Sequence, residues 1–168
     1  EFFDVTKTIH NALQGAETAL TADQQDIYRR YNELNAEEFE DVHDYVCIHD
    51  PQPAAMIDHF PDSEAQWIWR CHIDLSTPNQ SVLGVLLPSL ARYDAHIYHM
   101  HEYVPRHEDL PEAFIWPPAI DPLNPKNMAL SPEDAAFVCD QFGSDVDRPL
   151  ICQVSRFDPW KDPIGVID

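Results

Sequence analysis

The sequence predicts an α/β fold in which a parallel sheet is flanked by helices. Short apolar runs typical of strands alternate along the chain with stretches typical of helices. Alternation of this kind favours a parallel sheet with helices packed on both faces. The chain has 168 residues, of which 44% are hydrophobic, and this is enough to build the core of one ordinary domain.

The predicted elements follow in order along the chain. A first segment of helical character precedes a polar surface helix over 21–41, where Thr21 is the N-cap and Gln24 completes a capping box. Strands are predicted at 45–49, 67–72, 95–100, 113–116 and 150–155. Helices are predicted at 53–60, 79–93 and 132–142, and Pro88 is expected to kink the helix 79–93 or end it early.

A break in this pattern falls at 117–127, where four prolines occur in eleven residues. Proline at this density prevents regular structure and predicts a stiff linker. We therefore predict that 1–116 form the later half of one α/β domain and that 128–168 form the first elements of a second domain.

The composition excludes several classes of protein. Asp and Glu number 30 against 10 Lys and Arg, so the formal net charge is −20 and nucleic acid is not an expected partner. The sequence contains neither an apolar run long enough for a membrane span nor a signal peptide, so we expect no membrane association and a cytoplasmic location. The four cysteines form no CxxC pair and are expected to be buried thiols.

The segment QVSRFDPWKDPIGVID, 153–168, combines two cations with features of a phosphate site. The chain has no glycine-rich phosphate loop, but Arg156 follows a predicted strand, Lys161 lies five residues later, and Asp162 and Pro163 suit a helix start. A strand end, two cations and a helix N-terminus can hold a diphosphate. Surface cations that offset neighbouring aspartates fit the same spacing.

Two His/Asp pairs follow neighbouring predicted strands. His49 and Asp50 end the strand at 45–49, and His72 with Asp74 ends the next one. Because the carboxyl ends of parallel strands meet at one edge, where ligands bind in open α/β sheets, we predict a functional role for these pairs.

The segment 96–101 carries three further histidines. In an extended strand His99 and His101 share a face and His96 points the opposite way. We therefore predict a structural or surface role for these three rather than a metal site.

Polar side chains also line one face of the first predicted helix. His10, Asn11 and Gln14 share this face, while Ile9 and Leu13 form its apolar stripe. Such groups suit sugar hydroxyls, and they suit equally a helix end that packs against a loop.

Six ordered blocks together resemble one family. HNALQG, DYVCIHDPQPAA, WIWRCHIDLSTPN, YDAHIYHMHEYVP, PPAIDPLNPKN and QVSRFDPWKDP resemble the trehalose glycosyltransferring synthases, retaining enzymes of glycosyltransferase family 4. The resemblance implies the GT-B arrangement of two facing Rossmann-like domains. It implies that 1–116 are the second half of the N-terminal, acceptor-side domain and that 128–168 are the incomplete start of the nucleotide-sugar domain. We therefore expect a partial chain that lacks its remainder, including a carboxylate pair on the donor side, and is inactive alone.

The resemblance also implies a reaction and a set of site residues. The implied reaction transfers glucose from a nucleoside-diphosphate glucose to glucose and forms trehalose with retention of configuration. Arg156 and Lys161 match the catalytic cations that hold the donor diphosphate, and His72 matches a catalytic histidine. The residues expected to line the acceptor side are His10, Asn11, Gln14, His49, Asp50, Gln52, Arg70 and Asp74. No cofactor or metal ligand is implied, while a divalent cation and a homodimer are compatible with the resemblance.

Three alternatives remain open on the sequence alone. One is a trehalose phosphorylase or another retaining GT-B transferase, in which phosphate or a different donor takes part. The second is a metal-dependent hydrolase that uses His49, Asp50, His72 and Asp74. The third is a binding module without catalysis.

Overall fold

The computed structural model describes residues 1–155, 157 and 161–167. The chain divides into two units, Glu1–Ala119 and Ile120–Asp168. The predicted domain boundaries stay a prediction.

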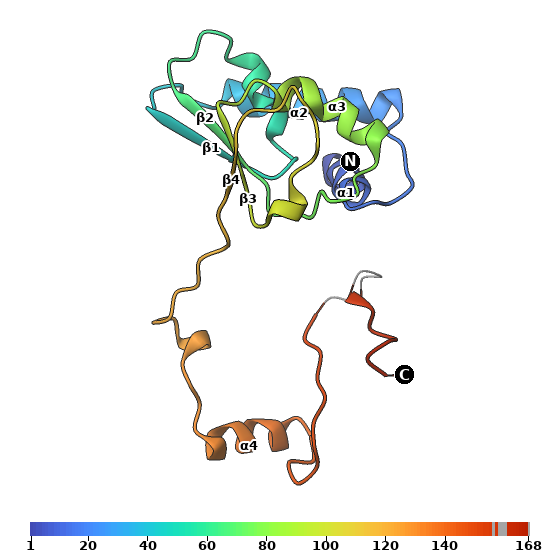
Figure 1. Ribbon diagram of the computed structural model, residues 1–168, viewed down its shortest axis with the longest axis vertical. Coiled ribbons are helices and arrows are strands. Elements are labelled where there is room, and N and C mark those ends of the chain that lie inside the picture. Colours follow the sequence, from blue (N-terminus) through green and yellow to red (C-terminus); the bar gives the residue numbers. More distant parts are fainter. Residues whose placement is uncertain (156, 158–160, 168) are drawn as a thin grey trace. The chain divides into compact units, whose positions relative to one another are not determined.

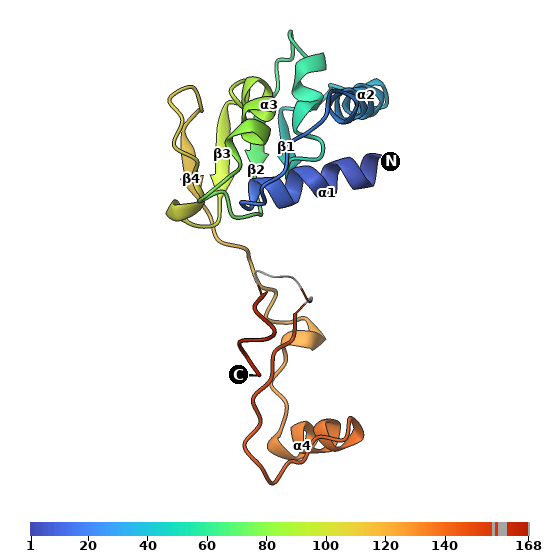
Figure 2. The ribbon, with the colours of Figure 1, turned by 90° about the vertical axis from the view of Figure 1, so that its right-hand side faces the viewer.

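The first unit contains the predicted parallel sheet. Its strands are β1 (Tyr45–His49), β2 (Gln66–Arg70), β3 (Ala95–Tyr98) and β4 (Ala113–Ile115). Neighbouring strands pair in parallel in the order β1-β2-β3-β4, and Figure 2 shows them side by side. Both β2 and β3 end two residues earlier than predicted, so the residues that follow them are free to form the loops of the carboxyl edge.

The helices of this unit are α1 (Phe2–Leu13), α2 (Ala22–Glu37) and α3 (Gln80–Leu90). Two short 3₁₀ helices complete it, η1 (Ala54–His59) and η2 (His101–Tyr103). The predicted helix 53–60 is therefore a 3₁₀ helix, because its amides bond three residues back, as Phe60 N does to Ile57 O at 3.1 Å. As Pro88 indicated, α3 ends early, at Leu90.

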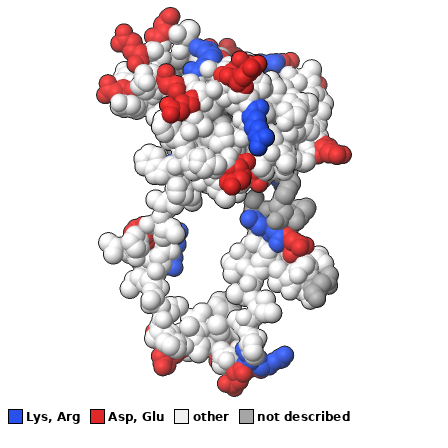
Figure 3. Space-filling view, viewed as in Figure 1, with Lys and Arg blue, Asp and Glu red and all other residues white. Residues whose placement is uncertain are grey.

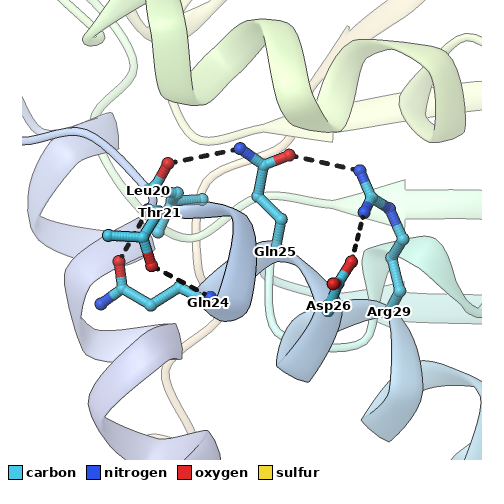
Figure 4. A network of polar contacts seen from close by, with 6 residues as sticks. All are labelled: Leu20, Thr21, Gln24, Gln25, Asp26 and Arg29. Atoms are coloured by element: carbon cyan, nitrogen blue, oxygen red, sulfur yellow. Dashed lines mark hydrogen bonds and ion pairs between the residues drawn. The ribbon is translucent and has the colours of Figure 1, made fainter.

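The start of α2 confirms the predicted capping box (Figure 4). The Gln24 amide donates to Thr21 Oγ1 at 3.2 Å, and the Thr21 amide donates to Gln24 Oε1 at 3.0 Å. Gln25 Nε2 also donates to the Leu20 carbonyl, and Arg29 donates to Gln25 Oε1, which extends the network along the helix. These local bonds fix where α2 begins.

One face of α2 is buried, although the sequence predicted a polar surface helix. Tyr28, Asn32 and Ala36 lie at a spacing of four residues and are all buried. Two of these three residues are polar, so the apolar periodicity of the sequence did not identify this face.

The helices lie on one face of the sheet, not on both as predicted (Figure 1). The crossovers β1–η1–β2 and β2–α3–β3 run in the same direction across the sheet, and right-handed crossovers of this kind lie on the same side. On this side the sheet buries alternate residues, among them Ile48, Trp69 and Tyr98. The other residues of the strands lie on the opposite face, which we call the open face.

The cysteines follow this division. Cys71 is buried, but Cys47 is exposed, because it lies on the open face of β1. In the second unit Cys152 is exposed and Cys139 is partly buried. The prediction of four buried thiols was therefore wrong for Cys47 and Cys152.

The second unit contains η3 (Pro125–Asn127) and α4 (Pro132–Gln141). The predicted helix 132–142 is confirmed, and Ser131 caps it by accepting a bond from the Asp134 amide at 3.0 Å. Nowhere in the described residues of either unit is there a helix long and apolar enough to cross a membrane.

Two predictions for 150–167 were wrong. Residues 150–155 form no strand, and Ile151 and Val154 are exposed, because no neighbouring strand in the described part of this unit receives their backbone hydrogen bonds. The described residues 162–167 form turns instead of a helix start. Asp162 has a φ of 44°, and its carboxylate accepts the Gly165 amide at 3.2 Å.

Candidate functional site

The register of the sheet brings three histidines to one edge and one face. His49 is the last residue of β1 and pairs with Arg70, which in turn pairs with Ile97. Side chains alternate between faces, so His49 and Arg70 lie on the open face, and so do His72 and His99, each two residues further along its chain. This carboxyl edge is the one that the two His/Asp pairs predicted.

These three residues, His49, His72 and His99, form what we call the histidine cluster. His49 Nδ1 lies 2.7 Å from His72 Nε2, and His72 Nδ1 lies 3.1 Å from His99 Nε2. The planes of the His49 and His72 rings lie within 14° of each other with centroids 5.0 Å apart, and His99 meets His72 edge-on at 5.1 Å. Cys47 Sγ extends the row, because it lies 3.6 Å from His49 Nε2.

The surroundings of His72 disfavour its charged form. Partial burial of the otherwise exposed His72 lowers its pKa most strongly, and the neighbouring His49, Arg70 and His99 lower it further, while Asp50 acts in the opposite direction. A histidine with a lowered pKa stays neutral near pH 7, so it can accept a proton there.

Asp50 joins the ends of β1 and β2. It has a φ of 65°, its amide donates to the Arg70 carbonyl at 2.9 Å, and its Oδ1 accepts the His72 amide at 2.8 Å. Asp50 therefore binds the backbone of His72, the histidine of the other predicted pair, rather than the ring of its neighbour His49. A left-handed backbone at a residue other than glycine carries strain, and here two hydrogen bonds hold it in place.

Buried side chains hold the loop 50–52 from below. The carbonyls of residues 50, 51 and 52 accept in turn from Trp69 Nε1 at 2.9 Å, Tyr28 Oη at 2.7 Å and Asn32 Nδ2 at 3.1 Å. All three donors belong to buried residues. We call this arrangement the carbonyl cradle, and it fixes the segment that carries Asp50 and Gln52.

Asp74 and the predicted acceptor residues of α1 do not belong to the cluster. Asp74 Oδ1 accepts the Ser76 amide at 2.7 Å and so shapes the loop after β2. His10, Asn11 and Gln14 are partly buried at the end of α1, and Ile9 and Leu13 are buried in the core as predicted. Among the described residues, no hydrogen bond links the side chains of His10, Asn11 or Gln14 to the histidine cluster.

The end of α1 is nevertheless tied to the loop after β2. Asn79 donates its amide to the Ala12 carbonyl at 3.0 Å, and its side chain donates to the carbonyls of Ala16 and Thr18. Gly15 has a φ of 96°, and a Cβ placed on it would lie 3.1 Å from the Thr77 carbonyl. The end of α1 and the loop after β2, which both carry predicted acceptor residues, therefore meet in the first unit.

Arg70 belongs to the first unit, whereas the predicted donor-side cations belong to the segment after the linker. Arg70 Nη2 donates to the Trp116 carbonyl at 3.4 Å, so its side chain reaches across the open face towards the end of β4. Arg156 lies outside the described residues. Lys161 is exposed in the second unit, where its carbonyl accepts a bond from Gln153 Nε2. The proposed diphosphate site is thus left as a prediction.

His99 is the residue that the sequence did not assign to the site. Of the three histidines at 96–101, His96 is fully buried and His101 is exposed, which fits the predicted structural or surface role. His99 instead contacts His72. Its position just past the end of a third parallel strand was a signal for the same edge, but the predicted strand was too long to show it.

The first unit also contains a cavity of about 420 Å³, and none of the three histidines of the cluster lines it. Its lining comes from the segments that follow His72 and His99. The polar lining residues are Ser76, Gln80, His101, Glu102 and Arg106. A volume of this size lies within the range of small-molecule sites, roughly 300–1,000 Å³. In the described part of the chain, no group of three His, Cys, Asp or Glu side chains has the arrangement of a metal site.

Comparison with known proteins finds similarity to trehalose synthases. Residues 1–105 match the family model described as trehalose synthase, N-terminal domain. The chain is 54% identical to a trehalose synthase of Rubrobacter xylanophilus over 99% of its own length and 41% of the relative's length. It is 48% identical to a trehalose synthase of Thermococcus litoralis and 46% identical to one of Pyrococcus horikoshii, over all of its own length and 41% of theirs.

The chain thus spans about two fifths of the length of the curated relatives that it matches. The family model covers well over half of the chain and includes the whole histidine cluster and the carbonyl cradle. The chain belongs to the trehalose synthase N-terminal domain family.

Proposed function

We propose that the chain is part of a glucosyltransferase that transfers glucose from a nucleoside-diphosphate glucose to glucose and forms trehalose with retention of configuration. The observation that carries this proposal is the histidine cluster, which lies at the ligand-binding edge of a sheet whose family is named for trehalose synthesis. The relatives' names support trehalose chemistry, while the donor and the stereochemistry are our inference.

In this proposal the first unit supplies the acceptor side. A glucose hydroxyl that attacks the donor must lose its proton, so it needs acceptors and oriented polar groups around it. Asp50, Gln52 and Asp74 lie on loops that hydrogen bonds hold in place, and His72 stays neutral and can interact with the reacting sugar. A cavity lined by the segments that follow His72 and His99 has the size and polar lining to admit a sugar ring.

The donor side of the proposal rests on Arg156 and Lys161. When a nucleoside diphosphate leaves, negative charge develops on its oxygens, and cations held in place there stabilise the transition state more than the ground state. We propose that these two residues have this role, and that a full donor site needs segments of the longer protein.

Sugar binding to the full chain tests the proposal. We expect glucose and trehalose to shift the NMR signals of the His49, His72 and His99 rings and of the 50–52 amides, while mannitol at equal concentration does not shift them. With nucleoside-diphosphate glucose and glucose, we expect the chain alone to form no trehalose. The acceptor-side assignment would be abandoned if both sugars left these signals unchanged at concentrations of tens of millimolar.

A further inference from the structure

We propose that His49, His72 and His99 act as a single unit that takes up and shares one added proton. In this unit His99 is a positioning residue that sets the tautomer and the charge of His72. The proposal deepens the proposed function, because His72 is its proposed catalytic residue. The contacts on which it rests lie within this chain and need no bound ligand.

Both ring nitrogens of His72 are engaged by other imidazoles. Nε2 meets His49 Nδ1 at 2.7 Å and Nδ1 meets His99 Nε2 at 3.1 Å. Each contact is a hydrogen bond only if one nitrogen carries the proton and the other does not. A neutral His72 carries one N–H, so it donates to one neighbour and accepts from the other.

When all three rings are neutral, the row of hydrogen bonds can therefore run in only two directions. In the first, His49 Nδ1–H donates to His72 Nε2, and His72 Nδ1–H donates to His99 Nε2, which leaves the proton of His99 on its Nδ1. In the second, His99 Nε2–H donates to His72 Nδ1, and His72 Nε2–H donates to His49 Nδ1, which leaves His99 Nδ1 bare. Each direction uses one proton per ring, so the tautomer of His99 fixes that of His72.

Cys47 and His99 Nδ1 are the two ends of this row. In the first direction the Cys47 thiol donates to His49 Nε2, and in the second His49 Nε2–H donates to the sulfur. Burial raises the pKa of the Cys47 thiol, which favours a protonated end here. His99 Nδ1 has no hydrogen-bond partner among the described residues, so it is the end that solvent or a ligand hydroxyl can reach.

An added proton is shared and a second one is disfavoured. The His49 and His72 centroids lie 5.0 Å apart and those of His72 and His99 5.1 Å, so two imidazolium charges on neighbouring rings would repel at close range. The charged groups that face His72 are Asp50 and Arg70, which act with opposite signs. The cluster therefore takes up one proton first and a second only at lower pH.

NMR titration of the histidine ring signals in the full chain, without any ligand, tests the proposal. We expect each of the three rings to show the same inflections, separated by about one pH unit or more, as coupled sites do. His99→Gln should raise the pKa of His72, since a protonated His99 lowers it. His101→Gln is the matched control, because His101 is exposed and makes no hydrogen bond to the cluster among the described residues; it should leave the three curves unchanged.

His72→Gln is a second variant, which removes the central ring between His49 and His99. The His49 and His99 rings should then each follow a single-site curve. Independent single-site curves for all three rings in the unmodified chain would overturn the proposal, whatever the variants do. Because no sugar is present, this result is separate from the binding test of the proposed function.

Discussion

The Tyr28 hydroxyl of α2 donates to the Pro51 carbonyl at 2.7 Å, and so connects a helix to the loop of the candidate site. Two neighbouring carbonyls of the same loop are held by Trp69 and Asn32. Burial raises the pKa of Tyr28, so its hydroxyl keeps the proton that it donates. The loop that carries Asp50 is therefore fixed by the core beneath it.

Tyr28→Phe should loosen this loop specifically. It removes one donor and keeps the ring, so a buried carbonyl loses its partner at a cost of about 1–3 kcal/mol. We expect faster hydrogen exchange at the His72 amide, which bonds to Asp50 Oδ1. Tyr93→Phe is the control, since the Tyr93 hydroxyl donates to the Ala54 carbonyl at 2.8 Å outside this loop. Equal exchange at His72 in both variants would contradict the carbonyl cradle.

The sequence predicted best what depends on neighbouring residues. The capping box of Thr21 and Gln24, the strand at 45–49 and the helix after Ser131 all rest on short segments, and the structure contains each of them. Local bonds and alternation along one strand are sufficient to specify such elements.

Contacts between distant segments were not predictable in the same way. Tyr28 and Pro51 are 23 residues apart, and nothing in the pattern of α2 indicates that a polar face packs beneath a loop. His99 was missed for a related reason, because its contact with His72 depends on the register between strands and on where β3 ends. The apolar residues at 150–155 suggested a strand, but a strand also needs a partner.

Asn79 should be sensitive to the loss of its amide donors. Its Oδ1 accepts the Ser81 and Val82 amides at the start of α3, while its Nδ2 donates to the Ala16 and Thr18 carbonyls. Asn79→Asp keeps the cap but turns a carboxylate towards two carbonyls. We expect the free energy of unfolding to fall by about 1–3 kcal/mol in denaturant titrations.

Asn124→Asp is the matched control for that substitution. Asn124 Oδ1 caps η3 by accepting the Lys126 amide at 3.1 Å, and this hydrogen bond is exposed. We expect it to leave the stability of the first unit unchanged. A cost for Asn79→Asp no larger than that of Asn124→Asp would show that the bonds to 16 and 18 contribute little.

His96 should make the first unit less stable in acid. It is fully buried between the Leu90 carbonyl and the Tyr98 hydroxyl, and burial lowers its pKa to about 4. In the unfolded chain a histidine takes up its proton near pH 6.5, whereas folded His96 does so only near pH 4. The part of the unfolding free energy that depends on neutral His96 is therefore complete above pH 6.5 and is lost as the pH falls towards 4. The expected slope is ~1.4 kcal/mol per pH unit in that window.

The slope is measured as a difference between variants, because many carboxylates also titrate in acid. We expect His96→Gln to remove this part of the pH dependence from 6.5 to 4, whereas the exposed His101→Gln should keep it. Parallel stability curves for the unmodified chain and His96→Gln would mean that His96 protonates in the folded state as readily as in the unfolded one.

Two acidic residues at opposite ends of α2 should respond to substitution with opposite signs. The net charge is −20, and Figure 3 shows acidic side chains spread over the visible surface of the first unit. Asp23 lies in the first turn of α2, and Glu37 is its last residue, with no basic residue in that turn. A negative charge stabilises a helix N-terminus and destabilises a C-terminus.

Asp23→Asn and Glu37→Gln change the net charge equally, so any difference between them reports the helix ends. We expect Asp23→Asn to lower and Glu37→Gln to raise the unfolding temperature at low salt, because the first removes a favourable interaction with the helix dipole and the second an unfavourable one. Both shifts should shrink in 1 M NaCl, where the screening length falls to about 3 Å. If both variants instead stabilised the chain to the same extent, overall repulsion from the net charge would outweigh the position of each carboxylate on α2.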